Sequence, residues 1–336
     1  MEKPKQEFFT SIHFLRGVAA FLVVLCHSPK GFEKLHPQFT AILNPLGSGV
    51  NTFLVISGFI IPYSMYKNKY VISDFKQFIL RRVVRLEPPY IISIIMVLLL
   101  NYMNTLYPWY HGPAYSIPWG LTLRHLAYIN TFTGEHWLQW VYWTLAVEFQ
   151  FYLLLSVIFP LLTHPNKKIM FTTFYCLLAL AFIQIPGRPY FIFHYLVFFL
   201  MGISLFLYMT DKIKLKEFYF LLIPTYLMLC YIFGSAMHAT MLHICSVATL
   251  PCIYYIKNVP KPLLFMGTIS YSIYLTHMVL TSRFITLFEK YLHMNFYMAW
   301  TLCIICCVIF AYIFYLLFEK PFLALSKKVK IHKAVK

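Results

Sequence analysis

Long apolar runs, separated by short polar or proline-bearing breaks, dominate the chain. A helix that crosses a membrane needs about 20 mostly apolar residues. Runs of this kind predict ten transmembrane helices, at 12–29, 46–66, 86–103, 138–162, 169–185, 189–209, 217–234, 236–256, 263–286 and 295–318. The pattern therefore indicates an all-α, polytopic membrane protein, and it leaves no stretch for a separate soluble domain.

The composition supports this interpretation. Of the 336 residues, 60% are hydrophobic and 12% are charged, and the mean hydropathy is +0.68. Soluble domains carry about 25% charged residues, so this chain has too little polar surface to cover a water-soluble core. We expect residues 1–336 to form one transmembrane domain.

The basic residues predict the orientation. With a cytoplasmic N-terminus and ten spans, 21 of the 28 Lys and Arg residues fall in cytoplasmic segments, as the positive-inside rule requires. Both termini are then cytoplasmic. The net charge of +17 is explained by this asymmetry and by contact with lipid headgroups, and it does not indicate nucleic-acid binding, which needs a basic soluble face.

The cysteines do not predict a metal site. All eight lie inside or at the ends of apolar spans. The group at positions 303, 306 and 307 lacks the additional His or Cys of a zinc site. We therefore expect no metal cofactor and interpret these cysteines as small packing residues.

The first predicted span contains an arginine and a histidine. Arg16 and His27 are eleven residues apart, which places both on one helix face, about 16 Å apart along the axis. Ionisable residues inside a membrane are costly and usually functional. The alternative is an interfacial Arg whose side chain reaches the headgroups and a His that begins the outer loop.

Glu148 lies in the middle of the run at 138–162. A carboxylate at this depth must be paired, hydrated or protonated. We expect it to pair with His27, whose ring it would orient, or with an arginine. A purely structural ion pair is the alternative.

Three arginines precede the third predicted span. Arg81, Arg82 and Arg85 point into one 100° sector of a helix at the predicted cytoplasmic end. Guanidinium groups bind phosphate in bidentate fashion, and three together predict a polyanionic ligand. The alternative is positive-inside topology combined with lipid headgroup contacts.

Weaker signals come from other polar and aromatic side chains within the spans. Asn51 and Ser57 stand among small residues at the start of the second span, a pattern that indicates close helix packing more often than chemistry. Tyr271, Tyr274 and His277 are expected to line a polar cavity or, equally well, to pack through hydrogen bonds. Trp143 would belong to an interfacial aromatic belt or stack on a sugar.

Six segments together resemble acyltransferase family 3, the integral-membrane acyl-CoA-dependent acyltransferases. In order along the chain they are LRGVAAFLVVLCH, GVNTFLVISGFII, RRVVRLEPPY, WTLAVEFQFY, ISYSIYLTH and FEKPF. The resemblance covers practically the whole chain. It implies a multi-pass protein of the cell membrane, such as the bacterial inner membrane, that transfers an acetyl group from acetyl-CoA to a hydroxyl of a surface or lipid-linked carbohydrate.

The resemblance also implies roles for individual residues. The family's arginine and histidine in the first span match Arg16 and His27, with His27 as the general base. Its cluster of three arginines matches those at 81, 82 and 85, which would bind acetyl-CoA. Its WSLSVEEQFY segment matches residues 143–152 and retains its first glutamate as Glu148. We expect the acceptor to contact Asn51, Ser57, Trp143, Tyr271 and His277.

The chain departs from the family pattern at two positions and in its length. Asn51 stands where an acidic residue is common, and Phe149 replaces the second glutamate. No C-terminal SGNH hydrolase-like domain is expected, so the protein would act alone, as a homo-oligomer or with a glycan-assembly partner. The alternative function is a transporter or flippase of a glycan or lipid-linked sugar, which would bind its substrate without acyl transfer.

Overall fold

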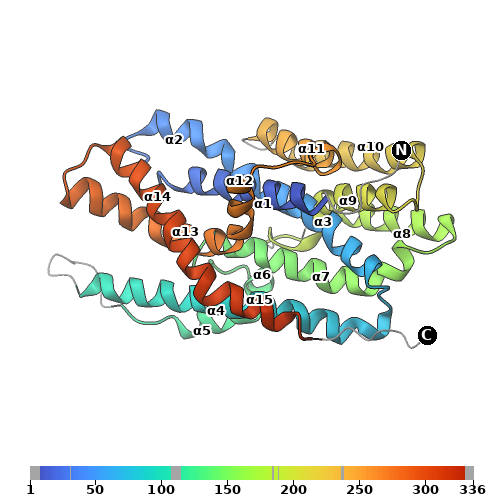
Figure 1. Cartoon of the computed structure of the whole chain (residues 1–336), viewed down its shortest axis with the longest axis horizontal. Helices are drawn as coiled ribbons and strands as arrows, with labels where there is room; N and C mark the ends of the chain where they lie inside the picture. Colours follow the sequence, from blue (N-terminus) through green and yellow to red (C-terminus); the bar gives the residue numbers. More distant parts are fainter. Residues whose placement is uncertain are drawn as a thin grey trace.

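The computed structural model describes residues 8–30, 32–106, 115–183, 185–187, 189–235 and 238–329. These residues form a bundle of α-helices, with no β-strand among them (Figure 1). The helices are α1 (Phe8–His27), α2 (Pro37–Leu43), α3 (Gly49–Lys67), α4 (Phe75–Thr105), α5 (Trp119–Leu126), α6 (Asn130–Thr133), α7 (Tyr142–Leu162), α8 (Lys167–Leu180), α9 (Ile192–Met209), α10 (Leu215–Phe233), α11 (Ala239–Tyr255), α12 (Lys261–Thr268), α13 (Ser270–Thr286), α14 (Phe296–Phe314) and α15 (Lys320–Ser326).

Each of the ten predicted spans contains a helix, but fewer than ten are long and apolar enough to cross a membrane. Seven helical segments of the described chain meet that condition, and α12 with α13, bent by 68° at their junction, makes an eighth. Helices α8 and α11 have only 14 and 17 residues. The predicted run at 169–185 overshoots α8 because apolar residues such as Phe182 and Ile183 continue into the connection, where they are exposed.

Helix α4 begins eleven residues before the predicted start of its span at residue 86. It has 31 residues and is about 46 Å long at 1.5 Å per residue, which exceeds a hydrocarbon core of about 30 Å. The early start places the three predicted arginines on the helix itself, within its first three turns. Their directions are therefore fixed by the helix and not by a loop.

Helix α9 forms the centre of the larger hydrophobic core. Fourteen of its 18 residues are buried, and it packs against α3, α7 and α10. A helix that is apolar on all sides is expected in such a position. The closest approach is to α3, where a glycine on each helix faces the backbone of the other helix. A Cβ on Gly58 of α3 would lie 2.1 Å from the carbonyl oxygen of Phe199, and a Cβ on Gly202 of α9 would lie 2.1 Å from the carbonyl oxygen of Val55.

Helix α1 runs through the middle of the bundle, against α3, α12 and α13 (Figure 1). Its buried apolar face includes Ala19, Ala20, Val23 and Val24. Small and β-branched residues allow the neighbouring helices to approach closely. This packing fixes the rotation of α1 and therefore the direction of the two ionisable side chains that it carries.

We predict that the Gly58→Ala substitution destabilises the protein. The added methyl group has no room against the backbone of α9, so the helices must separate, at a cost of about 1–3 kcal/mol. Gly120→Ala is the control, because its Cβ would meet only the end of the flexible Arg124 side chain, at 3.2 Å. Thermal unfolding of the purified protein in detergent measures both, and equal midpoints for the two variants would contradict the close-packing account.

Candidate active site

A cavity of about 560 Å³ lies between α1, α3, α4, α7 and α13. Its volume falls within the range typical of small-molecule sites, about 300–1,000 Å³. Along α3 it is lined from Val50 to Lys67, a rise of about 25 Å. The cavity is therefore long enough for an extended ligand.

One end of the cavity is strongly basic, and we call it the arginine end. Arg16, Arg82 and Arg85 all line it, together with Lys67. An adjoining cavity of about 140 Å³ is lined by Arg81, and also by Arg82 and Arg85. The structure thus brings together all four arginines that the sequence singled out.

No carboxylate neutralises these arginines directly. Within the described part of the chain, Arg16, Arg82 and Arg85 form no salt bridge and donate no hydrogen bond to a protein group. The Arg82 guanidinium lies between the rings of Phe78 and Tyr152, 5.4 and 5.3 Å from their centroids, which holds it in place through cation–π contacts. The N–H groups of the cluster are consequently available to an anionic ligand.

Two glutamates, Glu319, which is buried, and Glu148, which is half-buried, lie near the arginines but accept hydrogen bonds from other groups. Glu148 lines the cavity and accepts a hydrogen bond of 2.8 Å from the Ser57 hydroxyl. Glu319 accepts from the backbone N–H of Ser272 at 3.1 Å and from its hydroxyl at 2.6 Å. Sequence reasoning missed Glu319 as a site residue, although its place in FEKPF at the end of a long apolar run was an available signal.

The opposite end of the cavity, next to Phe53, carries hydroxyl groups. Thr144 and Tyr274 both line it and hydrogen-bond to each other, and the Tyr274 hydroxyl also donates to the carbonyl of Val141 at 2.7 Å. The Tyr274 ring is 6.0 Å from the ring of His277, one turn further along α13. The cavity therefore ends next to a buried histidine.

His27 lies beyond that point, paired with His277. Nδ1 of His27 is 3.0 Å from Nε2 of His277, and the two rings are stacked at an interplanar angle of 14°. Both side chains are buried, and neither points to the exterior. His27 does not itself line the cavity, from which it is separated by Tyr274 and His277.

This pairing corrects one expectation from the sequence. Glu148 was expected to orient His27, but in the described residues these two side chains do not contact each other. The Glu148 carboxylate accepts a hydrogen bond from the Ser57 hydroxyl on α3. The imidazole of His277, on α13, lies beside His27 where Glu148 was expected.

The other predicted site residues divide into two groups. Ser57 and Tyr271 line the cavity, and the Tyr271 hydroxyl donates to the carbonyl of Leu86 at 2.9 Å. Asn51 is buried in α3 outside the lining, and Trp143 packs against the rings of Tyr190 and Tyr195 with centroids 5.2 and 4.9 Å away. These aromatic contacts are typical of packing, here between α7 and both α9 and the residue Tyr190 that precedes it.

Among the residues that the structure describes, no three His, Cys, Asp or Glu side chains lie close enough together to hold a metal ion. The polar chemistry of the cavity comes from guanidinium, carboxylate, hydroxyl and imidazole groups.

The comparison with protein families identifies the scaffold. A family model described as an acyltransferase domain, that of acyltransferase family 3, matches residues 9–317. The chain belongs to this family. No curated protein and no solved structure matches the chain. With seven or eight membrane-length helices in the described part of the chain, this family 3 acyltransferase is a multi-pass membrane protein. The matched segment contains the whole lining of the main cavity.

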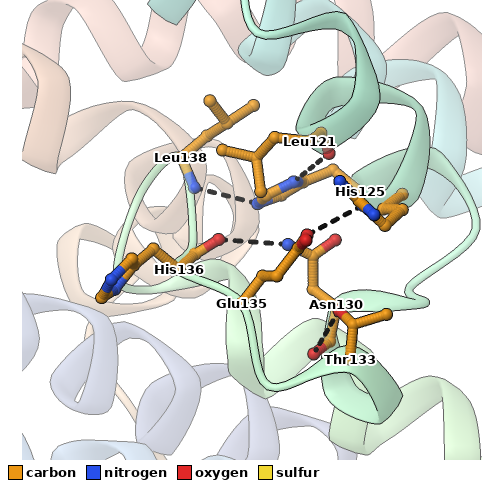
Figure 2. Close-up of polar contacts among 8 residues, drawn as sticks. Leu121, His125, Asn130, Thr133, Glu135, His136 and Leu138 are labelled. Atoms are coloured by element: carbon orange, nitrogen blue, oxygen red, sulfur yellow. Dashed lines mark hydrogen bonds and ion pairs between the residues drawn. The ribbon is translucent and has the colours of Figure 1, made fainter.

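The acyltransferase contains a third buried histidine, His125, whose hydrogen bonds are unambiguous. Nδ1 of His125 in α5 faces the carbonyl of Leu121 at 2.8 Å, and Nε2 accepts the backbone N–H of Leu138 at 2.9 Å (Figure 2). A salt bridge of 2.8 Å between Arg124 and Glu135 lies beside it. This network connects α5 to the segment that leads into α7.

Burial lowers the pKa of His125 below its ordinary value, although its hydrogen bond to Leu121 and the charge of Glu135 act in the opposite direction. The unfolded chain therefore binds a proton more readily, and stability falls as the pH drops below about 6.5. Protonation also removes the acceptor for the Leu138 N–H.

We predict that the thermal unfolding midpoint of the wild-type protein is lower at pH 5.5 than at pH 7.5, and that this difference is smaller in the His125→Gln variant. An identical pH dependence of the midpoint in the two proteins would contradict the prediction.

Proposed function

We propose that this acyltransferase transfers an acetyl group from acetyl-CoA to a hydroxyl group of a cell-surface or lipid-linked carbohydrate. The observation that carries the proposal is the shape and charge of one cavity. Its basic end holds three guanidiniums that form no salt bridge with any described residue, and its other end lies beside the His27–His277 pair. This combination suits a long donor with phosphates at one end and a reactive thioester at the other.

In the proposal, the phosphates of acetyl-CoA bind at the arginine end. Guanidinium forks match phosphate geometry, and their charge-assisted hydrogen bonds are the strong ones. Arg81, Arg82 and Arg85 would hold the adenosine phosphates, with Arg16 deeper in the cavity. The excess of Lys and Arg in the segments at this end favours a cytoplasmic location, where the donor is made.

The pantetheine arm would extend along α3 toward Tyr274. Its amide groups would meet the hydroxyls and the Glu148 carboxylate, which can accept an amide N–H. The thioester would then lie at the Thr144–Tyr274 contact, and a shift of the Tyr274 side chain would open the route to His27. In this proposal Glu148 acts on the donor and not on the histidine.

For the chemical step, a carbohydrate hydroxyl would approach His27 from the opposite side of the membrane. His27 would remove the hydroxyl proton as a general base while the oxygen forms a bond to the acetyl carbonyl carbon. The C–S bond would break, and the CoA thiolate would take the proton from the imidazolium. The products are an O-acetyl ester and free CoA, and atoms and charge balance without a metal or redox partner.

We predict that Arg85→Lys weakens donor binding about 10-fold to 100-fold, because a point charge loses the bidentate hydrogen bonds, worth about 1.5–3 kcal/mol. Isothermal titration of the purified protein with acetyl-CoA measures this. Arg124→Lys is the matched control, since Arg124 lies outside the cavity in a salt bridge with Glu135. An unchanged donor Kd in Arg85→Lys would contradict the phosphate site.

We predict that His27→Ala lowers acetyl transfer by at least about 100-fold, the usual contribution of a general base, and leaves the donor Kd within twofold. Membrane vesicles given radiolabelled acetyl-CoA measure transfer as alkali-labile label in the carbohydrate. Full transfer by folded His27→Ala would refute the role of His27. Movement of carbohydrate without acetyl-CoA consumption would indicate a transporter.

A further inference from the structure

The protonation of His277 can be read from its hydrogen bonds. Its Nδ1 is 3.0 Å from the backbone carbonyl of Ile273, four residues earlier in α13. A carbonyl oxygen can only accept, so Nδ1 of His277 carries the proton. In a neutral imidazole the other nitrogen, Nε2, then has a lone pair, and this is the nitrogen that faces His27.

His125 provides an internal reference for this arrangement. Its Nδ1 also faces the carbonyl four residues earlier, and its Nε2 accepts from a backbone N–H, which can only donate (Figure 2). The same local geometry thus accompanies the Nδ1-protonated form at a position where no ambiguity exists. His277 has the same helix geometry, with the imidazole of His27 in place of the Leu138 N–H.

The surroundings of the pair favour two neutral rings. His277 is fully buried and His27 is 8% exposed, and a charge without a partner is costly in such a place. Among the described residues, no carboxylate forms a salt bridge with either ring, and the cation of Lys30 lies near both. Tyr274, the titratable neighbour on α13, closes the cavity side.

We propose that His277 is a positioning residue that fixes the tautomer of His27. With Nε2 of His277 as acceptor, Nδ1 of His27 must donate, and the lone pair of His27 is placed on its Nε2. Nε2 has no hydrogen-bond partner within the described residues, so it is the nitrogen left to remove a proton. The catalytic purpose of this positioning rests on the proposed function, whereas the tautomer of His27 follows from the hydrogen bonds alone.

The pair also explains why a carboxylate beside His27 is not needed. When Nε2 takes the proton of the acceptor hydroxyl, His27 becomes an imidazolium that still donates through Nδ1 to His277. The proton then leaves from Nε2 to the thiolate. His277 thus performs the orienting task that a carboxylate performs in a Ser-His-Asp triad, but without a negative charge in the membrane interior.

Two substitutions at position 277 separate positioning from packing. His277→Gln keeps an acceptor that can face His27 Nδ1, and His277→Leu fills similar space without one. We expect kcat to fall at least about 100-fold in His277→Leu and to stay within about tenfold of the wild-type value in His277→Gln, with the donor Kd unchanged in both. His125→Gln is the control for loss of a buried histidine elsewhere, and we expect it to keep the wild-type kcat.

A spectroscopic measurement tests the tautomer directly. In ¹⁵N-histidine-labelled protein, the solid-state NMR signals lost in His27→Ala belong to His27. We expect a protonated Nδ1 and an unprotonated Nε2 in the wild type, and a mixture of tautomers in His277→Leu. A protonated Nε2 in the wild-type spectrum would overturn the proposal, as would equal kcat losses in folded His277→Gln and His277→Leu.

The outcome also distinguishes this inference from the proposed function. If the wild type transfers no acetyl group but shows the Nδ1-protonated His27, the proposed function fails and the pairing stands. If transfer occurs but His27 carries its proton on Nε2, the function stands and the positioning role of His277 is wrong.

Discussion

The site depends on positive charge that the protein holds half-buried in one cavity, without a salt bridge to it among the described residues. Arg16, Arg82 and Arg85 line this cavity, and the nearby carboxylates of Glu148 and Glu319 accept hydrogen bonds from serine hydroxyls. A charge that is partly withdrawn from water without a partner is costly, so the cavity favours an anionic ligand. The aromatic rings around Arg82 and the packing of α1 keep the guanidiniums in place, and an anionic ligand would neutralise their charge.

The remaining features of the bundle position this charge relative to the histidines. The close glycine contact between α3 and α9 gives α3 a fixed place, and α3 provides much of one wall of the cavity. Helix α1 carries Arg16 near its middle and His27 at its C-terminal end, and α13 contributes Tyr274 and His277 in successive turns. Three helices therefore connect the basic end to the imidazole pair across the bundle.

The positions of the helices could be predicted from the sequence because a membrane imposes a minimum length of apolar chain. Their exact ends could not, since exposed loop residues such as Phe182 look the same as buried ones in a hydropathy pattern. The count of ten spans is not confirmed for this reason. The start of α4 was also missed, because charged residues interrupt the apolar residues of its first turns.

The arginine cluster could be predicted because guanidiniums at helical spacing are conspicuous beside an apolar run. The partner of His27 could not, since His277 lies 250 residues away and hydropathy gives no information on which helices meet. Glu148 was chosen because it is an acidic residue in the middle of a predicted apolar run, but its carboxylate accepts a hydrogen bond from the Ser57 hydroxyl. Side-chain pairing between distant helices is a property of packing and needs coordinates.

The most direct test of the whole account is a structure of the protein in a lipid nanodisc with a non-hydrolysable acetyl-CoA analogue. The account predicts phosphate density against Arg16, Arg82 and Arg85 and the acyl end beside Tyr274, within reach of His27 Nε2. Phosphate density elsewhere, with the arginine end empty, would contradict it.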